Sequence, residues 1–301
     1  MIRVRHLSKS FGAVRAVDDV SFDVERGSIF AFLGTNGAGK STTIGCVTTV
    51  LAPDAGHIEV GGHAVGTEAD EVRRLVGVVF QQSLLDPVLT VRENLDLRAA
   101  FYGLDRAARR ARIGEIAPLI GVDGILDRRY GTLSGGQKRR ADIARALAHA
   151  PSVLFLDEPT AGLDPASREQ VWETVHRLRR DAGLTVFLTT HYMHETEEAD
   201  QVCVIDAGRI VQEGTPSALR ERFSSSILTV TPRDPAPIRT ACANRGLTVT
   251  ETQGVLAIEV DSSATARAIL HEHDAHIEDF EFRHGTMDDV FLALTSRTVD
   301  A

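Results

Sequence analysis

Apolar and polar positions along the first two thirds of the chain predict strands and helices in alternation. Residues 2–7 and 20–25 alternate apolar with polar side chains, as half-buried antiparallel strands do. Apolar runs predict more deeply buried strands at 28–33, 76–80, 153–158 and 184–190. One intervening helix begins with Asp164 and Pro165, residue types that suit the N-cap and N1 positions. We therefore expect an α/β core accompanied by a small antiparallel β subdomain.

Residues 84–130 depart from this alternation because their pattern is helical throughout. Thr90 and Glu93 have the spacing of a capping box, which would open a helix running to about residue 102. Asp105 is expected to cap a second helix, which Gly121 ends. We interpret this insert as an α-helical subdomain.

A second domain is expected where small polar residues cluster at 222–226, giving domains at 1–222 and 223–301. Its elements are predicted at 227–231, 236–245, 247–252, 254–260, 263–272, 276–283 and 286–295. The first six follow the order β-α-β-β-α-β, which is that of a split βαβ, ferredoxin-like α+β sandwich. The last is a helix.

The overall composition is that of an ordinary soluble globular protein, with 301 residues, 43% hydrophobic and 25% charged. No apolar run in the sequence approaches the roughly 18 residues of a membrane helix, and no secretory signal is expected at its start. The net charge of −9 argues weakly against nucleic-acid binding. A role at a membrane would therefore need a separate membrane-embedded partner.

One stretch matches the pattern G-x-x-x-x-G-K-[ST], which wraps nucleotide phosphates. It consists of Gly34, Thr35, Asn36, Gly37, Ala38, Gly39, Lys40, Ser41 and Thr42. Its glycines let backbone N–H groups point at phosphate oxygens, Lys40 adds positive charge, and the Ser41 hydroxyl can bind Mg²⁺. A strand at 28–33 and a helix at 40–50 would flank the loop. The sequence therefore predicts a nucleotide-phosphate site.

Two adjacent carboxylates end the strand predicted at 153–158. In a chain with a phosphate loop, Asp157 is placed to hold the Mg²⁺ shell. Glu158 could take a proton from attacking water if it faces the γ-phosphate. The alternative, two solvated acids leaving a strand, is disfavoured by the loop upstream.

Three other candidates are ambiguous from the residues alone. Phe11, in an expected turn at 8–12, could equally stack on a nucleobase or fold back on the small sheet. Gln81 follows the strand at 76–80, where ligands bind in α/β sheets, but a loop amide facing water is favoured. Ser134, followed by two glycines at a helix start, is a second candidate anion site, with an ordinary N-cap favoured.

Histidines and cysteines give only weak metal signals. His191 and His194 lie one turn apart but lack a third ligand. The histidine-rich tract at 271–276 spans a predicted helix end, so a solvated loop is favoured there. Three isolated cysteines without metal-type spacing suit a reducing cytoplasm and buried thiols, namely Cys46, Cys203 and Cys242.

Together these motifs resemble those of the ATP-binding subunit of an ABC transporter, over residues 2 to about 220. In the family's order, the matching segments are 34–42 (Walker A loop), Gln81 (Q-loop), 133–137 (LSGGQ signature), 153–158 (Walker B), 161–164 (D-loop) and His191 (switch histidine). Two positions depart from the family pattern. Thr35 stands where proline is usual, which removes no ligand, and Phe11 replaces the commoner tyrosine while keeping the ring.

The resemblance implies that residues 34–42 bind ATP together with Phe11, which would stack on the adenine. Ser41 and Gln81 would contact Mg²⁺, and Asp157 would hold the water shell of the metal. Glu158 would be the general base for hydrolysis.

The resemblance also implies that two copies, or two paired ATPase subunits, meet head to tail around the nucleotide. The signature residues Ser134, Gly135, Gly136 and Gln137 of one subunit would close on the γ-phosphate held by the other. His191 and the facing Asp164 would orient the attacking water. Such closure adds an anion site and excludes water from the phosphate.

The implied function is ATP hydrolysis that powers a separate transmembrane permease from the cytoplasmic face of the cell membrane. The helical insert at 84–130 would touch that permease, and no nucleic-acid partner is expected. The segment 288–295 further resembles the exporter branch related to drug and antibiotic efflux.

Two alternatives remain. A DNA-maintenance or translation ATPase of the same superfamily usually has long heptad arms or two cassettes, neither of which this sequence shows. A non-catalytic regulatory subunit is disfavoured because Lys40, Asp157, Glu158 and His191 are all present.

Overall fold

The computed structural model describes residues 1–296 of the chain. The chain forms two compact units, the first being Met1–Glu213 and the second beginning at Gly214. Among the described residues, no helix is both long and apolar enough to cross a lipid bilayer.

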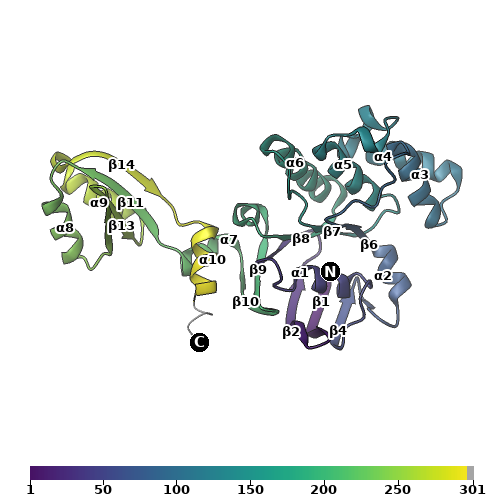
Figure 1. Ribbon diagram of the computed structural model, residues 1–301, viewed down its shortest axis with the longest axis horizontal. Helices are drawn as coiled ribbons and strands as arrows, with labels where there is room; N and C mark the ends of the chain where they lie inside the picture. The colour runs from purple at the N-terminus through teal and green to yellow at the C-terminus, as the bar shows by residue number, and fades with distance from the viewer. Residues whose placement is uncertain (297–301) are drawn as a thin grey trace. The chain divides into compact units, whose positions relative to one another are not determined.

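A six-stranded sheet with the order β10-β9-β3-β8-β7-β6 forms the centre of the first unit (Figure 1). Its strands are β3 (Ile29–Leu33), β6 (Val76–Val79), β7 (Val153–Asp157), β8 (Thr185–Thr190), β9 (Gln201–Asp206) and β10 (Arg209–Gly214). Strand β3 pairs in parallel with β8 and β9, and β7 with β6 and β8. All four predicted buried strands are therefore present, and their carboxyl ends meet at one edge of the sheet.

Helices cover both faces of this sheet. In Figure 1, α5 (Gly135–Ala146) and α6 (Pro165–Ala182) lie on one side, and α1 (Lys40–Val47) lies on the other, next to the small sheet. Turns and a 3₁₀ helix, Met193–Glu198, follow β8. This arrangement confirms the predicted P-loop type of α/β core.

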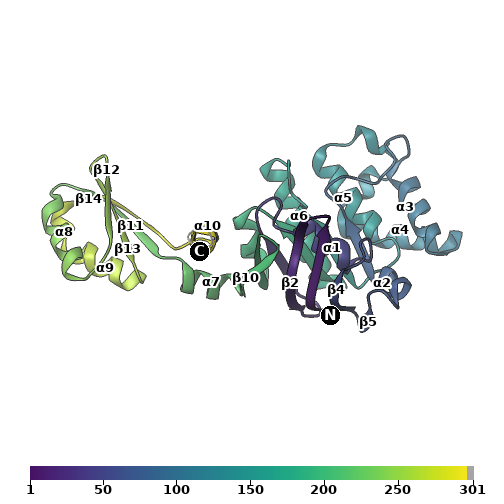
Figure 2. The ribbon, with the colours of Figure 1, turned by 60° about the horizontal axis from the view of Figure 1, so that its bottom comes forward.

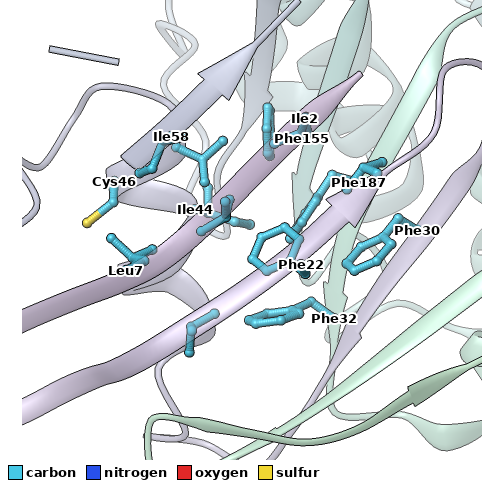
Figure 3. Packing of buried hydrophobic residues seen from close by; sticks show 14 of the residues in the cluster. Ile2, Leu7, Phe22, Phe30, Phe32, Ile44, Cys46, Ile58, Phe155 and Phe187 are labelled. Carbon is cyan, nitrogen blue, oxygen red and sulfur yellow. The ribbon is translucent and has the colours of Figure 1, made fainter. Parts of the chain in front are cut away.

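Phenylalanine side chains fill the space between the central sheet and the small sheet (Figure 3). Phe22 of the small sheet packs on Phe30, Phe32 and Phe187, with ring centroids between 5.4 and 5.9 Å away. Phe155 lies 5.2 Å from Phe187. All five rings are buried, and burial of each stabilises the fold by about 1.5–3 kcal/mol. The cluster thereby fixes the strands whose ends carry the candidate site.

The small antiparallel sheet has the order β2-β1-β4-β5. Its strands are β1 (Ile2–Phe11), β2 (Val14–Val24), β4 (Ala55–Val60) and β5 (His63–Ala64). The expected turn at 8–12 is wrong, because β1 continues to Phe11, which pairs with Val14. Register shifts between Val4 and Leu7 and beyond accommodate the polar segment within the hairpin.

The predicted all-helical segment is present. Helix α3 (Val91–Phe101) begins with the Thr90 capping box, and α4 (Arg106–Ile120) runs from the Asp105 cap to Gly121 at φ 70°. The remaining elements are α2 (Ala69–Leu75) and the 3₁₀ helices Asp123–Ile125 and Tyr130–Thr132. Figures 1 and 2 both show α3, α4 and α5 packed together.

The second unit contains a four-stranded antiparallel sheet with the order β12-β13-β11-β14 (Figure 2). Its elements are β11 (Ser226–Pro232), α8 (Pro235–Asn244), β12 (Val249–Thr252), β13 (Val255–Val260), α9 (Ser263–Glu272), a 3₁₀ helix Asp274–His276, β14 (Ile277–Arg283) and α10 (Met287–Ser296). This is the β-α-β-β-α-β order that the sequence predicted, with its own core around Leu228 and Ile258.

The boundary between the two units lies earlier in the chain than the sequence predicted. The prediction placed residues 214–222 in the first domain, whereas the structure places α7 (Pro216–Phe223) in the second unit. The reason is packing, because α7 contacts α10.

Candidate nucleotide-binding site

The loop at 34–42 connects β3 to α1 at the carboxyl edge of the central sheet. Gly39 is the N-cap of α1 at φ 107°, and a Cβ there would lie 2.5 Å from the Ala16 carbonyl oxygen. Because Gly39 has no side chain, no side-chain cap covers the first amides of α1. Gly37 also has a positive φ, of 87°. The cradle therefore presents free helix N-terminal amides, which suit a phosphate.

The ammonium group of Lys40 is buried at the centre of the loop. It donates hydrogen bonds to the carbonyl oxygens of Gly34 at 2.8 Å and Thr35 at 3.0 Å. Burial lowers the pKa of Lys40, and the nearby carboxylates of Glu158 and Asp157 act against that shift. The loop thus holds this positive charge at the position where a phosphate anion would bind.

A hydroxyl and a carboxylate lie side by side below the loop. Ser41 Oγ donates to Asp157 Oδ1 at 3.3 Å, and Thr189 Oγ1 donates to the same oxygen at 2.6 Å. The parallel register of β7 and β8 sets Asp157 opposite Thr189. Hydroxyl and carboxylate oxygens are ligands that Mg²⁺ prefers, so this donor set fits that ion.

The Glu158 carboxylate is the meeting point of three predicted site residues. Its Oε1 lies 3.7 Å from Lys40 Nζ and 3.2 Å from His191 Nδ1. Its Oε2 accepts a hydrogen bond from Gln81 Nε2 at 3.4 Å. The His191 Nδ1 atom is buried and lies close to this carboxylate without hydrogen-bonding geometry to any described residue. Gln81 is exposed, as the water-facing interpretation expected, and its amide nitrogen also contacts the Glu158 carboxylate.

The ring of Phe11 is accessible to solvent. It is 50% exposed at the end of the β1–β2 hairpin, with Lys9 Nζ 5.7 Å from the ring centroid. The ring is therefore not buried in the core of the small sheet, and its stacking on a nucleobase stays a prediction.

The remaining predicted site residues form helix caps rather than contacts with Lys40. Ser134 caps α5 in a capping box with Gln137, and Asp164 caps α6 by accepting from the Ser167 amide at 3.0 Å. The Ser167 hydrogen bonds lower the pKa of Asp164. Gly136 approaches α6 so closely that a Cβ would lie 2.6 Å from Ser167 Oγ. The N-terminal ends of α5 and α6 in one chain are thus packed against each other.

Two further residues touch the site that sequence reasoning did not select. Thr189 binds Asp157 as described, and Arg139 donates from α5 to the Glu158 carbonyl oxygen at 3.2 Å. Neither had a distinguishing signal, because Thr189 is one of three threonines in β8 and Arg139 is one of three arginines in α5. His194, by contrast, lies 3.0 Å from Arg168 Nη1. Within residues 1–296, no group of three or more His, Cys, Asp or Glu side chains could hold a metal ion.

Comparison with known proteins places this geometry in a family. A sequence profile of the ABC transporter family matches residues 17–161. The chain is 39% identical to the daunorubicin/doxorubicin resistance ATP-binding protein DrrA of Streptomyces peucetius, over 99% of this chain and 93% of that protein. It is 35% identical to the linearmycin resistance ATP-binding protein LnrL of Bacillus subtilis, over 99% of each chain.

A solved structure shows the same core. A dimeric ATP-binding cassette in a post-hydrolysis state, bound to ADP and Pi, is 27% identical, with a TM-score of 0.65 over 71% of this chain and 98% of that one. The two near-full-length relatives and this shared core agree on one family. The chain belongs to the ABC transporter family, in which it is an ATP-binding subunit.

Proposed function

We propose that Glu158 is the general base of ATP hydrolysis in this subunit. The observation that carries the proposal is the position of its carboxylate, 3.7 Å from the Lys40 ammonium group. If Lys40 binds the γ-phosphate, that carboxylate is within reach of a water that attacks it. Gln81 and His191 contact the same carboxylate and would orient the water and the phosphate.

Ser41 and Asp157 are the proposed residues around Mg²⁺, with Ser41 as a direct ligand and Asp157 acting through water. Mg²⁺ would supply charge neutralisation on the phosphate oxygens. Gln81 would add its amide oxygen, because its nitrogen is the atom that faces Glu158.

We further propose that two ATP-binding subunits close head to tail on two nucleotides. Ser134, Gly135 and Asp164 are exposed, so a second subunit can reach them. The similar cassette solved with ADP and Pi is itself dimeric. The N-terminus of α5 would then supply amides to the γ-phosphate held by Lys40 of the facing subunit.

A groove between α3 and α4 is the proposed contact for the permease. Its volume is 720 Å³, and its lining combines apolar Leu97 and Ile113 with Arg106 and Arg110. Leu97 is 48% and neighbouring Phe101 74% exposed, which favours a partner that covers them. This contact would hold the subunit at the cytoplasmic face of the membrane.

The cargo proposed from the relatives is a drug, an antibiotic or another hydrophobic compound. Two similar proteins are named for resistance, one to daunorubicin/doxorubicin and the other to linearmycin. Because this chain has the site for ATP, we expect selectivity for cargo to reside in the permease.

The test is an affinity pull-down of Glu158→Gln protein from detergent-solubilised host membranes, with Mg-ATP and with no nucleotide. A polytopic membrane protein identified by mass spectrometry in both conditions would support the proposed pairing with a permease. Recovery of DNA-repair or ribosomal proteins without a membrane partner would contradict it.

A matched variant makes the pull-down specific. Leu97→Glu and Phe101→Glu together place charge on the α3 surface but leave the phosphate loop untouched. Added to Glu158→Gln, this pair should abolish recovery of the membrane protein. In the otherwise unmodified chain, the same pair should leave ATP hydrolysis intact.

A further inference from the structure

Arg139 is a buried arginine that joins two parts of the site. It lies on α5, two residues after Gln137 of the signature segment, and only 7% of it is exposed. Its Nη1 donates to the Phe80 carbonyl oxygen at 2.9 Å, and its Nη2 donates to the Glu158 carbonyl oxygen at 3.2 Å. One guanidinium group thus connects the start of the Gln81 loop to Glu158.

The arginine fork suits this task because its donors are rigid and planar. Burial lowers the pKa of Arg139, but an arginine stays charged at every physiological pH. A buried charge is unfavourable unless it is well hydrogen-bonded. Two backbone carbonyls from separate loops supply part of that compensation.

The backbone at Glu158 needs such support. Glu158 has a φ of 47°, in the left-handed region that non-glycine residues seldom adopt. Its N–H donates to Thr189 Oγ1 at 3.1 Å and its carbonyl accepts from Arg139. With both peptide groups held, the direction in which the Glu158 side chain leaves the backbone is also set.

The same face of α5 holds the Gln81 loop at a second point. Asp142, one turn after Arg139, accepts a hydrogen bond from Ser83 Oγ at 2.5 Å and one from the Tyr130 hydroxyl at 3.3 Å. Asp142 is itself only 5% exposed. The Gln81 loop is therefore bound to α5 on both sides of Gln81, at Phe80 and at Ser83.

We propose that Arg139 is a positioning residue for hydrolysis. It holds Gln81 and Glu158 in a fixed relation to α5, the helix that presents Ser134 to a facing subunit. Movement of α5 when that subunit binds nucleotide is thereby transmitted to the Glu158 backbone of the same chain. The inference rests on the proposed function, in which Glu158 is the general base.

The chain contains a matched control. Arg145 lies on the same helix, is 6% exposed, and donates from Nη2 to the Val78 carbonyl oxygen of β6 at 2.5 Å. Burial lowers its pKa as it does for Arg139. Arg145 thus makes the same kind of buried contact, to a carbonyl two residues before Phe80, but it does not reach Glu158.

The experiment compares Arg139→Gln with Arg145→Gln in steady-state ATPase assays, nucleotide titrations and thermal unfolding. We expect both variants to lower Tm. Only Arg139→Gln should lower kcat, by about 100-fold, with nucleotide affinity kept, because small displacements of a catalytic group have effects of that size. Equal loss of kcat in both variants would reduce Arg139 to a structural role.

A double-mutant cycle with Glu158→Gln separates this inference from the proposed function. If Arg139 acts through Glu158, adding Arg139→Gln to Glu158→Gln should lower the residual rate no further. A further loss as large as in the wild-type background overturns the positioning role. Retained turnover in Glu158→Gln alone instead overturns the general base.

Arg139→Lys covers the case in which Arg139→Gln does not fold. The lysine keeps the charge but cannot bind both carbonyls with a planar fork. We expect a Tm near wild type and a kcat below it. Wild-type kcat in this variant would contradict the need for the paired contact.

Discussion

The carboxylate of Glu158 lies 3.7 Å from the ammonium group of Lys40, and the two side chains are only 11% and 5% exposed. Each charge therefore compensates the other in a site from which water is largely excluded. We expect an incoming γ-phosphate to replace the carboxylate as the partner of Lys40. That exchange would free Glu158 to accept a proton from water.

Lys40→Ala should abolish the increase in Tm that Mg-ATP produces in the unmodified protein. The variant loses a charge-assisted contact to phosphate, which is worth about 1.5–3 kcal/mol. It also leaves Glu158 buried without its cation, so the Tm without nucleotide should fall as well. Thermal-shift assays measure both changes in Tm, and titration with a fluorescent ATP analogue measures the affinity. An affinity equal to wild type would show that Lys40 does not bind phosphate.

Glu158→Gln should lower turnover by a factor of about 10²–10⁴, the usual contribution of a general base. ATP affinity should persist, because the substitution leaves Lys40 and the backbone amides of the loop at 34–42 in place to bind phosphate. Size-exclusion chromatography with Mg-ATP should show an accumulated dimer. Glu198→Gln is a suitable control, since that carboxylate is 51% exposed and pairs with His176. Loss of turnover in both variants would argue against a specific role.

The parts of the site that the sequence predicted best are those set by local spacing. The glycines and Lys40 occupy consecutive positions, so their cradle follows from the motif and its flanking elements. The placement of Asp157 followed from the apolar run before it, because such a strand ends at the sheet edge where the loop also lies. Both predictions needed only neighbours in the chain.

The parts that sequence reasoning missed depend on contacts between distant segments. Arg139 reaches Phe80 and Glu158 across the interior, and nothing in the spacing of charges along α5 indicates these carbonyl partners. The continuation of β1 to Phe11 was not predicted, because polar residues in bulged strands resemble a turn. Asp164 would complete a site only in the proposed head-to-tail pair of subunits.

Gly39→Ala should destabilise the fold and weaken ATP binding. A Cβ at this position would lie 2.5 Å from the Ala16 carbonyl oxygen, which is backbone and cannot rotate away. Gly37→Ala is the matched control, because its φ of 87° is also strained but no atom lies within 4 Å of the added carbon. Backbone strain of this kind costs about 1–3 kcal/mol in either variant. Urea unfolding should therefore show a larger loss for Gly39→Ala, and equal losses would contradict the steric argument.

Ser41→Ala should raise the Mg²⁺ concentration that supports half-maximal ATPase activity. The substitution removes only the hydroxyl group, and hydroxyl oxygen is a suitable ligand for this hard cation. Chelation of Mg²⁺ with EDTA should abolish turnover in the wild type. An unchanged Mg²⁺ requirement in the variant would remove Ser41 from the metal shell, while leaving its hydrogen bond to Asp157 as its role.

His149 predicts a pH dependence of stability that is independent of nucleotide. Its ring stacks on Tyr102 with centroids 3.9 Å apart, and its Nε2 donates to the Val76 carbonyl oxygen at 3.0 Å. Burial, reinforced by the charges of Arg98 and Arg145, lowers the pKa of His149 to about 4, against an ordinary value of 6.5. The folded protein therefore holds this ring neutral where the unfolded chain protonates it.

Between pH 6.5 and 4 the unfolded chain thus binds more protons at this position, so the free energy of unfolding should fall as the pH falls through that window. Above that window the contribution of His149 is fully present, and it amounts to at most about 3 kcal/mol. His149→Phe keeps the stacking on Tyr102 but cannot titrate, so urea unfolding across this pH range should show a flatter profile. His57→Gln, at a histidine whose side chain is 59% exposed, should leave the slope unchanged. A His149→Phe profile as steep as wild type would assign the acid sensitivity to other groups.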